Sequence, residues 1–168
     1  NQQTKLPNSI LRKALSQEIG SYIRPYPVFS SKPVDGKPLF MHALEGTLDS
    51  IKIPTHTETI YRAELIKTTS IHAHVLHAHT KNILAKAPTS NDPRKGLGKD
   101  FRQEEIRDAW QQITRHHQTY QVATIKITCA SGTYMRSLAK RLGNMFGTHA
   151  LALSIKRTSI GTYMPLFP

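Results

Sequence analysis

A tyrosine and an arginine stand two residues apart in "SGTYMR", where Tyr134 and Arg136 follow the turn-forming pair Ser131-Gly132. An arginine at such a place can hold a carboxylate through two parallel hydrogen bonds, which an ammonium group cannot do. Read in isolation, however, the pair is more typical of a core aromatic residue next to a solvated helix residue.

The charge of the chain is strongly basic, with 23 Lys and Arg against 11 Asp and Glu and a formal net charge of +12. From position 121 to the end there is no acid at all, and the basic residues there are Lys126, Arg136, Lys140, Arg141, Lys156 and Arg157. This distribution favours a polyanion as partner, with nucleic acid ahead of a membrane surface. The alternative is a basic protein whose charged face is merely solvated.

Cys129 is the only cysteine, so neither an internal disulfide nor a cysteine-based zinc site can form. We therefore expect a reducing, cytoplasmic location. No apolar run approaches transmembrane length and no signal peptide is recognisable. The sequence begins with Asn1 rather than Met, and we expect it to be a piece of something longer.

Four histidines gather in "HAHVLHAH", from His72 to His79. The stretch reads as a strand, which would put His72 and His74 on one face and His77 and His79 on the other. Two ligands a face fall short of the four that a structural zinc ion usually requires, so we favour an exposed strand over a metal site.

The elements that would position these residues alternate irregularly between helix and strand. We expect helices over 8–19 capped by Asn8, over 39–45 closed by Gly46, over 103–116 capped by Asp100, and after residue 134 with a core stripe from Leu138 to Phe146. We expect strands over 57–66, 70–80, 120–130 and 150–163, a turn at Asp35-Gly36 and a mobile loop over 86–98. In strand 57–66, strict alternation places Ile60 and Leu65 on opposite faces. The sequence therefore predicts an α+β domain with a mixed, mostly antiparallel sheet flanked by helices.

Two blocks, "ITCASGTYMRSLAKRLG" followed by "ALALSIKRTSIGTY", resemble the C-terminal motifs of the TruB-type tRNA pseudouridine synthases. A third block, "SQEIGSYIRPYPVFSSKPVDGKPLFMHALEG", is similar to a stretch of that family and stands in the right order before them. The resemblance covers nearly the whole chain except the His-rich stretch and the loop behind it. It implies the C-terminal half of the pseudouridine synthase fold.

The family flips a uridine out of an RNA loop and isomerises it without a cofactor, because a stacked base cannot be turned over in place. By resemblance the partner is tRNA, through the T-arm, and the target is U55. Tyr134 would be the pocket tyrosine, Arg136 the partner of the catalytic aspartate, and Ile155 the apolar wall against the base. The further substrate-binding residues implied are Gly132, Thr133, Lys32, Lys140, Lys156 and Arg157. No metal is implied.

The nucleophilic aspartate of the family has no counterpart in this chain. Asp49 lies in "GTLD", but the family's block continues differently and precedes everything seen here, so we expect Asp49 to be an ordinary loop acid. We therefore expect residues 1–168 to form a partial catalytic domain, inactive alone, whose one evident protein partner is the missing N-terminal part. Lys32 is displaced by one position relative to the family's lysine and precedes Pro33, and His149 matches no family histidine.

Two rival functions remain from other classes. One is a non-catalytic RNA-binding module derived from a synthase. The other is a basic structural protein that uses its sheet as an assembly surface.

Overall fold

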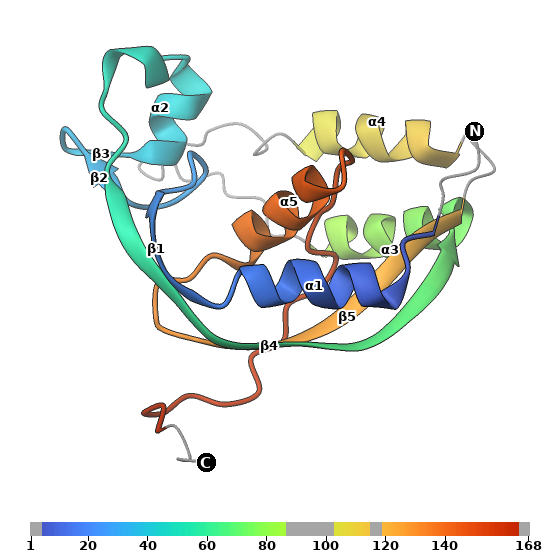
Figure 1. Ribbon diagram of the computed structural model, residues 1–168. Coiled ribbons are helices and arrows are strands. Elements are labelled where there is room, and N and C mark those ends of the chain that lie inside the picture. Colours follow the sequence, from blue (N-terminus) through green and yellow to red (C-terminus); the bar gives the residue numbers. More distant parts are fainter. Residues whose placement is uncertain (1–4, 87–102, 115–118, 165–168) are drawn as a thin grey trace.

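The computed structural model describes residues 5–86, 103–114 and 119–164, and its centre is a curved antiparallel sheet in the order β1–β4–β5 (Figure 1). Strand β4 runs along the whole base of the molecule, with helices above it (Figure 1). The strands are β1 (Gly20–Pro25), β2 (Pro33–Val34), β3 (Lys37–Pro38), β4 (Thr55–His72) and β5 (Thr119–Cys129). The helices are α1 (Asn8–Gln17), α2 (Leu39–Glu45), α3 (Ala73–Ala85), α4 (Gln103–Thr114) and α5 (Met135–Met145), with a 3-10 turn at Leu48–Ser50. This confirms the predicted α+β class with an antiparallel sheet.

Two irregularities bend β4 around the molecule. The register with β5 shifts between Ile60 and Arg62 and again between Leu65 and Lys67, so Tyr61 and Ile66 are extra residues on β4. Each β-bulge breaks the two-residue alternation and bends the strand. As a result Ile60 and Leu65 are both buried, and the prediction that they face opposite ways is wrong.

Helix α1 packs against β4 through its buried residues Ala14 and Leu15. Its N-cap is Pro7 rather than the predicted Asn8, whose side chain instead accepts a hydrogen bond from Thr68 at 2.9 Å. The helix therefore begins one residue earlier in the chain than the cap prediction required, and it ends at Gln17 rather than near residue 19.

A small unit of β2, β3 and α2 occupies one end of the curved sheet (Figure 1). The predicted turn at Asp35-Gly36 is confirmed, since both residues have positive φ (49° and 76°), as a tight hairpin of this length requires. Gly46 closes α2 at φ 70°, also as predicted. Buried His42 ties the unit together, because its ring lies 3.1 Å from both the Val34 carbonyl and the Thr47 hydroxyl.

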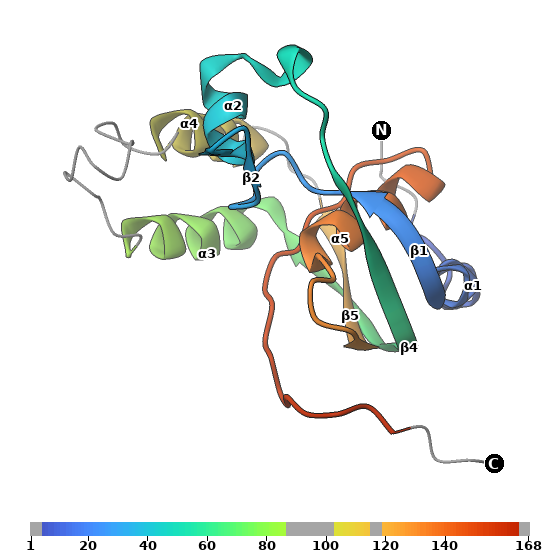
Figure 2. The same ribbon diagram turned by 90° about the vertical axis from the view of Figure 1, so that its left-hand side faces the viewer.

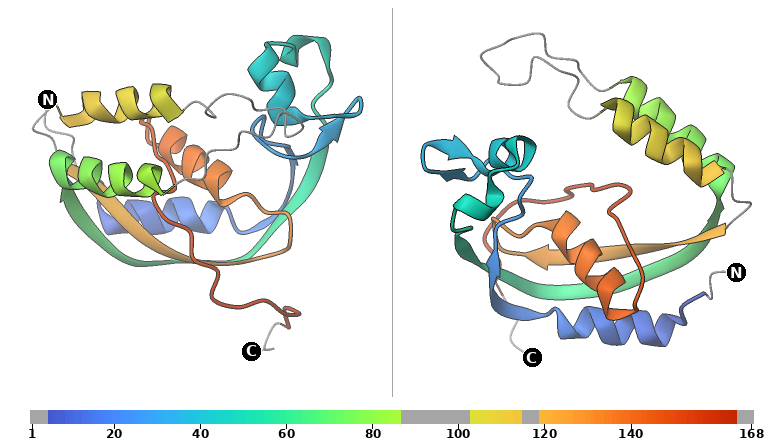
Figure 3. Two further views of the ribbon diagram at one scale, coloured as in Figure 1. Left: turned by 180° about the vertical axis from the view of Figure 1, so that it is seen from behind. Right: turned by 90° about the horizontal axis from the view of Figure 1, so that it is seen from above.

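The other end of the sheet carries α3 and α4, which lie side by side (Figures 2 and 3). The predicted strand over 70–80 is wrong beyond His72, because β4 ends there and α3 begins. Ala73, Leu76 and Thr80 are buried at helical spacing, a signal that the alternating histidines masked. Helix α4 confirms the predicted helix, whereas Asp100 and all but Lys86 of the predicted loop lie outside the described residues.

The predicted final strand over 150–163 is also wrong, because this segment pairs with no strand in the described part of the chain. It leaves the end of α5 and extends past the sheet, away from the helices (Figures 1 and 3). The described helices include none with the length and apolar character needed to cross a membrane.

Candidate active site

A β-turn at the end of β5 sets the position of Tyr134. The amide of Thr133 donates to the carbonyl of Ala130 at 3.4 Å, and the Thr133 hydroxyl donates to the same oxygen at 3.0 Å. Gly132, the third residue of this turn, has φ +88°, a value that side-chain-bearing residues rarely adopt. The turn delivers Tyr134 to the N-cap of α5, so the predicted strand, turn and helix around the motif are confirmed.

Three aromatic rings meet at Tyr134. Its ring lies edge-on to Tyr26, with centroids 6.1 Å apart, and edge-on to His56 at 5.5 Å. Tyr26 and His56 are stacked on each other at 4.1 Å. The ammonium group of Lys32 lies 5.2 Å from the Tyr26 ring centroid, a cation–π contact that brings this predicted residue to the edge of the cluster.

A buried ion network lies directly beneath this cluster. Glu58 accepts a hydrogen bond from the backbone N–H of Tyr134 at 3.1 Å, and its other oxygen lies 3.3 Å from Arg141. Arg141 also grips Glu18 with two nitrogens at 3.0 and 2.9 Å, and Arg24 approaches Glu18 to 3.7 Å. Both carboxylates are almost fully buried, at 2 and 3% side-chain exposure. Arg141 and Arg24 therefore neutralise the two buried carboxylates, one of which accepts the hydrogen bond from the Tyr134 amide.

This network corrects the use of Arg141 among the six basic residues after position 121 that favour a polyanion partner. Its guanidinium group is occupied by two carboxylates, and only 20% of its side chain is exposed. Glu18 and Glu58 come from the N-terminal part of the chain, so the acid-free C-terminal stretch is neutralised in part by acids distant in sequence.

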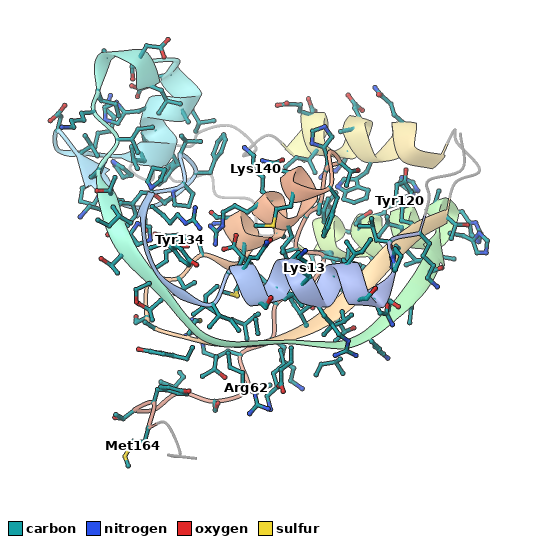
Figure 4. The ribbon with its side chains drawn as sticks, viewed as in Figure 1. Lys13, Arg62, Tyr120, Tyr134, Lys140 and Met164 are labelled. Atoms are coloured by element: carbon teal, nitrogen blue, oxygen red, sulfur yellow. The ribbon has the colours of Figure 1, made fainter. Side chains whose placement is uncertain are left out.

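Arg136 has a different environment. It is exposed on the first turn of α5, and its one described hydrogen bond runs to the carbonyl of Phe29 at 3.5 Å. Within the described residues it pairs with no carboxylate. Lys140, one turn further along, is exposed as well, and Tyr134 and Lys140 both lie on the inner side of the curved sheet (Figure 4).

Several buried polar atoms form no hydrogen bond within the described part of the chain, namely Arg24 Nε, Ser30 Oγ, both ring nitrogens of His56, and Glu58 Oε2. Two of them still have a charged group close by, since Glu58 Oε2 lies 3.3 Å from Arg141 and His56 Nε2 lies 3.4 Å from Glu58 Oε1. Buried polar groups in folded proteins are normally hydrogen-bonded, so Arg24 Nε, Ser30 Oγ and His56 Nδ1 are exceptions.

The remaining predicted residues lie away from regular structure. Ile155 is 58% exposed, and Lys156 and Arg157 are exposed beside it in the segment after α5. Asp49 is exposed in the 3-10 turn after α2, and His149 is exposed after α5. Among the described residues, no group of three or more His, Cys, Asp or Glu side chains is arranged to hold a metal ion.

Sequence reasoning missed Tyr26, His56, Glu18 and Glu58. For two of them a signal was present: His56, Glu58 and Ile60 share one face of a strand before the first bulge, and that face is the covered one. An acid on the covered face of a strand requires a cation, which here is Arg141.

Comparison with known proteins supports the family resemblance at low identity. No family model matches the chain. The tRNA pseudouridine synthase B of Lactobacillus delbrueckii is 26% identical over 153 residues, covering 91% of this chain and 36% of the relative. The enzyme of the same name from Bordetella avium is also 26% identical and covers 91% and 41%, and that of Chlamydia abortus is 37% identical over 70 residues, covering 42% and 28%. The chain thus spans about two fifths or less of these relatives. It is a distant homologue of tRNA pseudouridine synthase B over most of its own length.

Proposed function

We propose that this chain supplies the tyrosine–arginine half of an active site that isomerises a uridine of tRNA to pseudouridine. The single observation that carries the proposal is the contrast between two residues of one motif. Tyr134 is fixed by a turn, two rings and a carboxylate, whereas Arg136 is exposed with no carboxylate partner in the described chain. A fixed aromatic group beside an exposed guanidinium that pairs with no described carboxylate is suited to receive a carboxylate and a base.

In this proposal Tyr134 packs against the extruded nucleoside and Arg136 orients the catalytic carboxylate through paired hydrogen bonds. The turn residues Gly132 and Thr133 hold the backbone that presents both. Ile155 forms an apolar wall for the base, and Lys32, Lys140, Lys156 and Arg157 contact phosphates. U55 of the T-loop is the proposed target, and the cytoplasm the proposed compartment.

The carboxylate nucleophile comes from outside residues 1–168. Asp49 is a poor substitute, because it lies in an exposed turn after α2, with no described contact to Arg136 or Tyr134. The isomerisation breaks the bond from C1′ to N1 and forms one from C1′ to C5. The C5 proton is lost, N1 gains a proton, and no cofactor is required.

Loss of the C5 hydrogen gives a direct assay. We expect no tritium release when this chain alone is incubated with a tRNA transcript carrying 5-tritiated uridine. Release should begin when the chain is mixed with the part of the Lactobacillus delbrueckii synthase that precedes its aligned stretch, here called the synthase probe. Mixing the probe with its own aligned stretch is the positive control. If that control releases tritium and the mixture with this chain does not, the catalytic proposal is wrong.

The second candidate is a non-catalytic RNA-binding module, which the exposed cations after position 121 favour. It predicts salt-sensitive binding of a T-arm hairpin by this chain, with no tritium release in any mixture.

A further inference from the structure

His56 lies against both the ring of Tyr134 and the carboxylate that holds the Tyr134 backbone. The two rings meet edge-on, with centroids 5.5 Å apart and 82° between their planes. His56 Nε2 also lies 3.4 Å from Glu58 Oε1, the oxygen that accepts the hydrogen bond from the Tyr134 amide at 3.1 Å. One histidine therefore bears on the side chain and on the backbone of the tyrosine at once.

The His56 side chain is itself firmly held. It stands on β4 opposite Arg24 of β1, and only 10% of the side chain is exposed. Tyr26 stacks on the imidazole ring with centroids 4.1 Å apart and 26° between the planes. A side chain confined by a strand, a stacked ring and burial has few other rotamers, so it can fix the groups that it touches.

The charges around the ring favour a neutral imidazole. The described network contains two buried acids, Glu18 and Glu58, and two arginines, Arg24 and Arg141, so a further cation would leave it with excess charge. Because a carboxylate oxygen only accepts, the tautomer that fits carries its proton on Nε2, toward Glu58. The distance of 3.4 Å is long for a hydrogen bond, as is common in sites without ligand, where such bonds tighten on binding.

We propose that His56 is a positioning residue of the nucleoside-binding site, which holds Tyr134 in place through its ring and, by way of Glu58, through the Tyr134 amide. The inference rests on the proposed function, in which Tyr134 packs against the extruded nucleoside. Without His56 the tyrosine ring loses an edge contact and Glu58 loses a neighbour. Since a misplacement of about 1 Å can reduce an enzymatic rate by about 10²-fold, the rate should depend on this buried residue.

Two conservative variants separate the two contacts. His56→Gln places an amide N–H near the position of Nε2 but has no ring, whereas His56→Phe keeps a ring and has no donor. His56→Ala lacks both. A histidine that served only to fill space would be replaced fully by phenylalanine, so the comparison distinguishes positioning from packing.

Nuclear magnetic resonance of the chain alone gives the first readout, with the Tyr134 signals assigned by their absence in Tyr134→Phe. In His56→Ala the Tyr134 amide should exchange with solvent about tenfold faster, and its ring signals should shift. His56→Gln should restore slow amide exchange but not the ring signals, and His56→Phe should do the opposite. His79→Ala removes an exposed histidine of α3 and is the control that should change neither.

Turnover in the mixture with the synthase probe gives the second readout. His56→Ala should lower the single-turnover rate at saturating protein about 10- to 100-fold, with partial recovery in His56→Gln and in His56→Phe. Affinity for a T-arm hairpin should change less than about twofold, because the buried ring is not placed to contact phosphate.

Tyr134 signals that are the same in His56→Ala and in the unmodified chain would overturn the inference. So would full restoration of amide exchange, ring signals and rate by His56→Phe, because His56 would then be a packing residue. Tyr134 signals that depend on His56, in a chain whose mixture releases no tritium, would uphold the positioning and contradict the catalytic proposal. Tritium release that His56→Ala leaves unchanged would do the reverse.

Discussion

Replacing Arg141 by alanine should destabilise the chain far more than replacing its neighbour Lys140. Arg141 neutralises Glu18 and Glu58, whose side chains are only 2 and 3% exposed. Removing one partner of a buried ion pair typically costs about 3–5 kcal/mol, because the remaining charge stays desolvated. Glu18 keeps Arg24 at 3.7 Å and Glu58 keeps the hydrogen bond from the Tyr134 amide at 3.1 Å, so we expect the lower end, about 3 kcal/mol.

That free energy is measurable as a melting shift. For a chain of this size each kcal/mol lowers Tm by about 2–4 °C, so Arg141→Ala should lose about 6–12 °C in a thermal scan followed by far-UV circular dichroism. Lys140→Ala is the control, since Lys140 is exposed and should shift Tm by less than about 2 °C.

A triple variant separates the ion network from simple loss of packing. Arg141→Met with Glu18→Gln and Glu58→Gln removes all three charges but keeps the bulk and an oxygen that accepts from the Tyr134 amide. It should recover most of the lost stability, because neutral groups of similar volume carry no buried charge. Equal melting temperatures for Arg141→Ala and Lys140→Ala would refute the reasoning and leave Tyr134 without its electrostatic support.

Three further predictions concern the site and its turn. In an active mixture of chain and synthase probe, Arg136→Lys should strongly reduce the single-turnover rate at saturating protein and leave RNA affinity nearly unchanged, because the carboxylate loses its paired hydrogen bonds. Lys140→Ala should instead weaken RNA binding modestly and leave the turnover rate of bound RNA unchanged. The chain alone should bind a T-arm hairpin weakly, and if five exposed cations contact phosphate its affinity should fall by a factor on the order of 10² to 10³ between 50 and 200 mM salt. An affinity that does not change with salt concentration would favour the assembly-surface hypothesis instead. Gly132→Ala should cost about 1–2 kcal/mol by urea titration because of its φ of +88°, whereas Gly161→Ala, where an added Cβ meets nothing within 4 Å, should be neutral.

Turns and helix ends were predictable from the sequence where residues close together in the chain determine them. The turn at Asp35-Gly36, the close of α2 at Gly46 and the strand–turn–helix around Tyr134 all depend on residues within a few positions of one another. Glycine at positive φ and an apolar stripe need no distant partner to be recognised.

Features decided by distant contacts were not predictable. The bulges in β4 are set by its pairing with β5, and they place Ile60 and Leu65 together against the alternation. The His-rich stretch alternates like a strand, yet Leu76 and Thr80 are buried on helix α3, which packs against α4. The last segment has a strand pattern, but a strand forms only where a partner strand supplies hydrogen bonds.

The candidate site shows the same division. Tyr134 and Arg136 were identified by their motif, whereas Glu18, Glu58 and Arg141 meet only in the fold, across more than a hundred residues between Glu18 and Arg141. An ion network of this kind leaves no spacing pattern in the sequence.

Tritium release from 5-tritiated tRNA tests the central claim most directly, namely that this chain carries the tyrosine and arginine of the site but not its nucleophile. The account predicts no release by the chain alone. In the mixture with the synthase probe it predicts release that Tyr134→Ala abolishes and Asp49→Asn leaves unchanged. Release by the chain alone that disappears with Asp49→Asn would contradict the account, because the nucleophile would then lie within these residues.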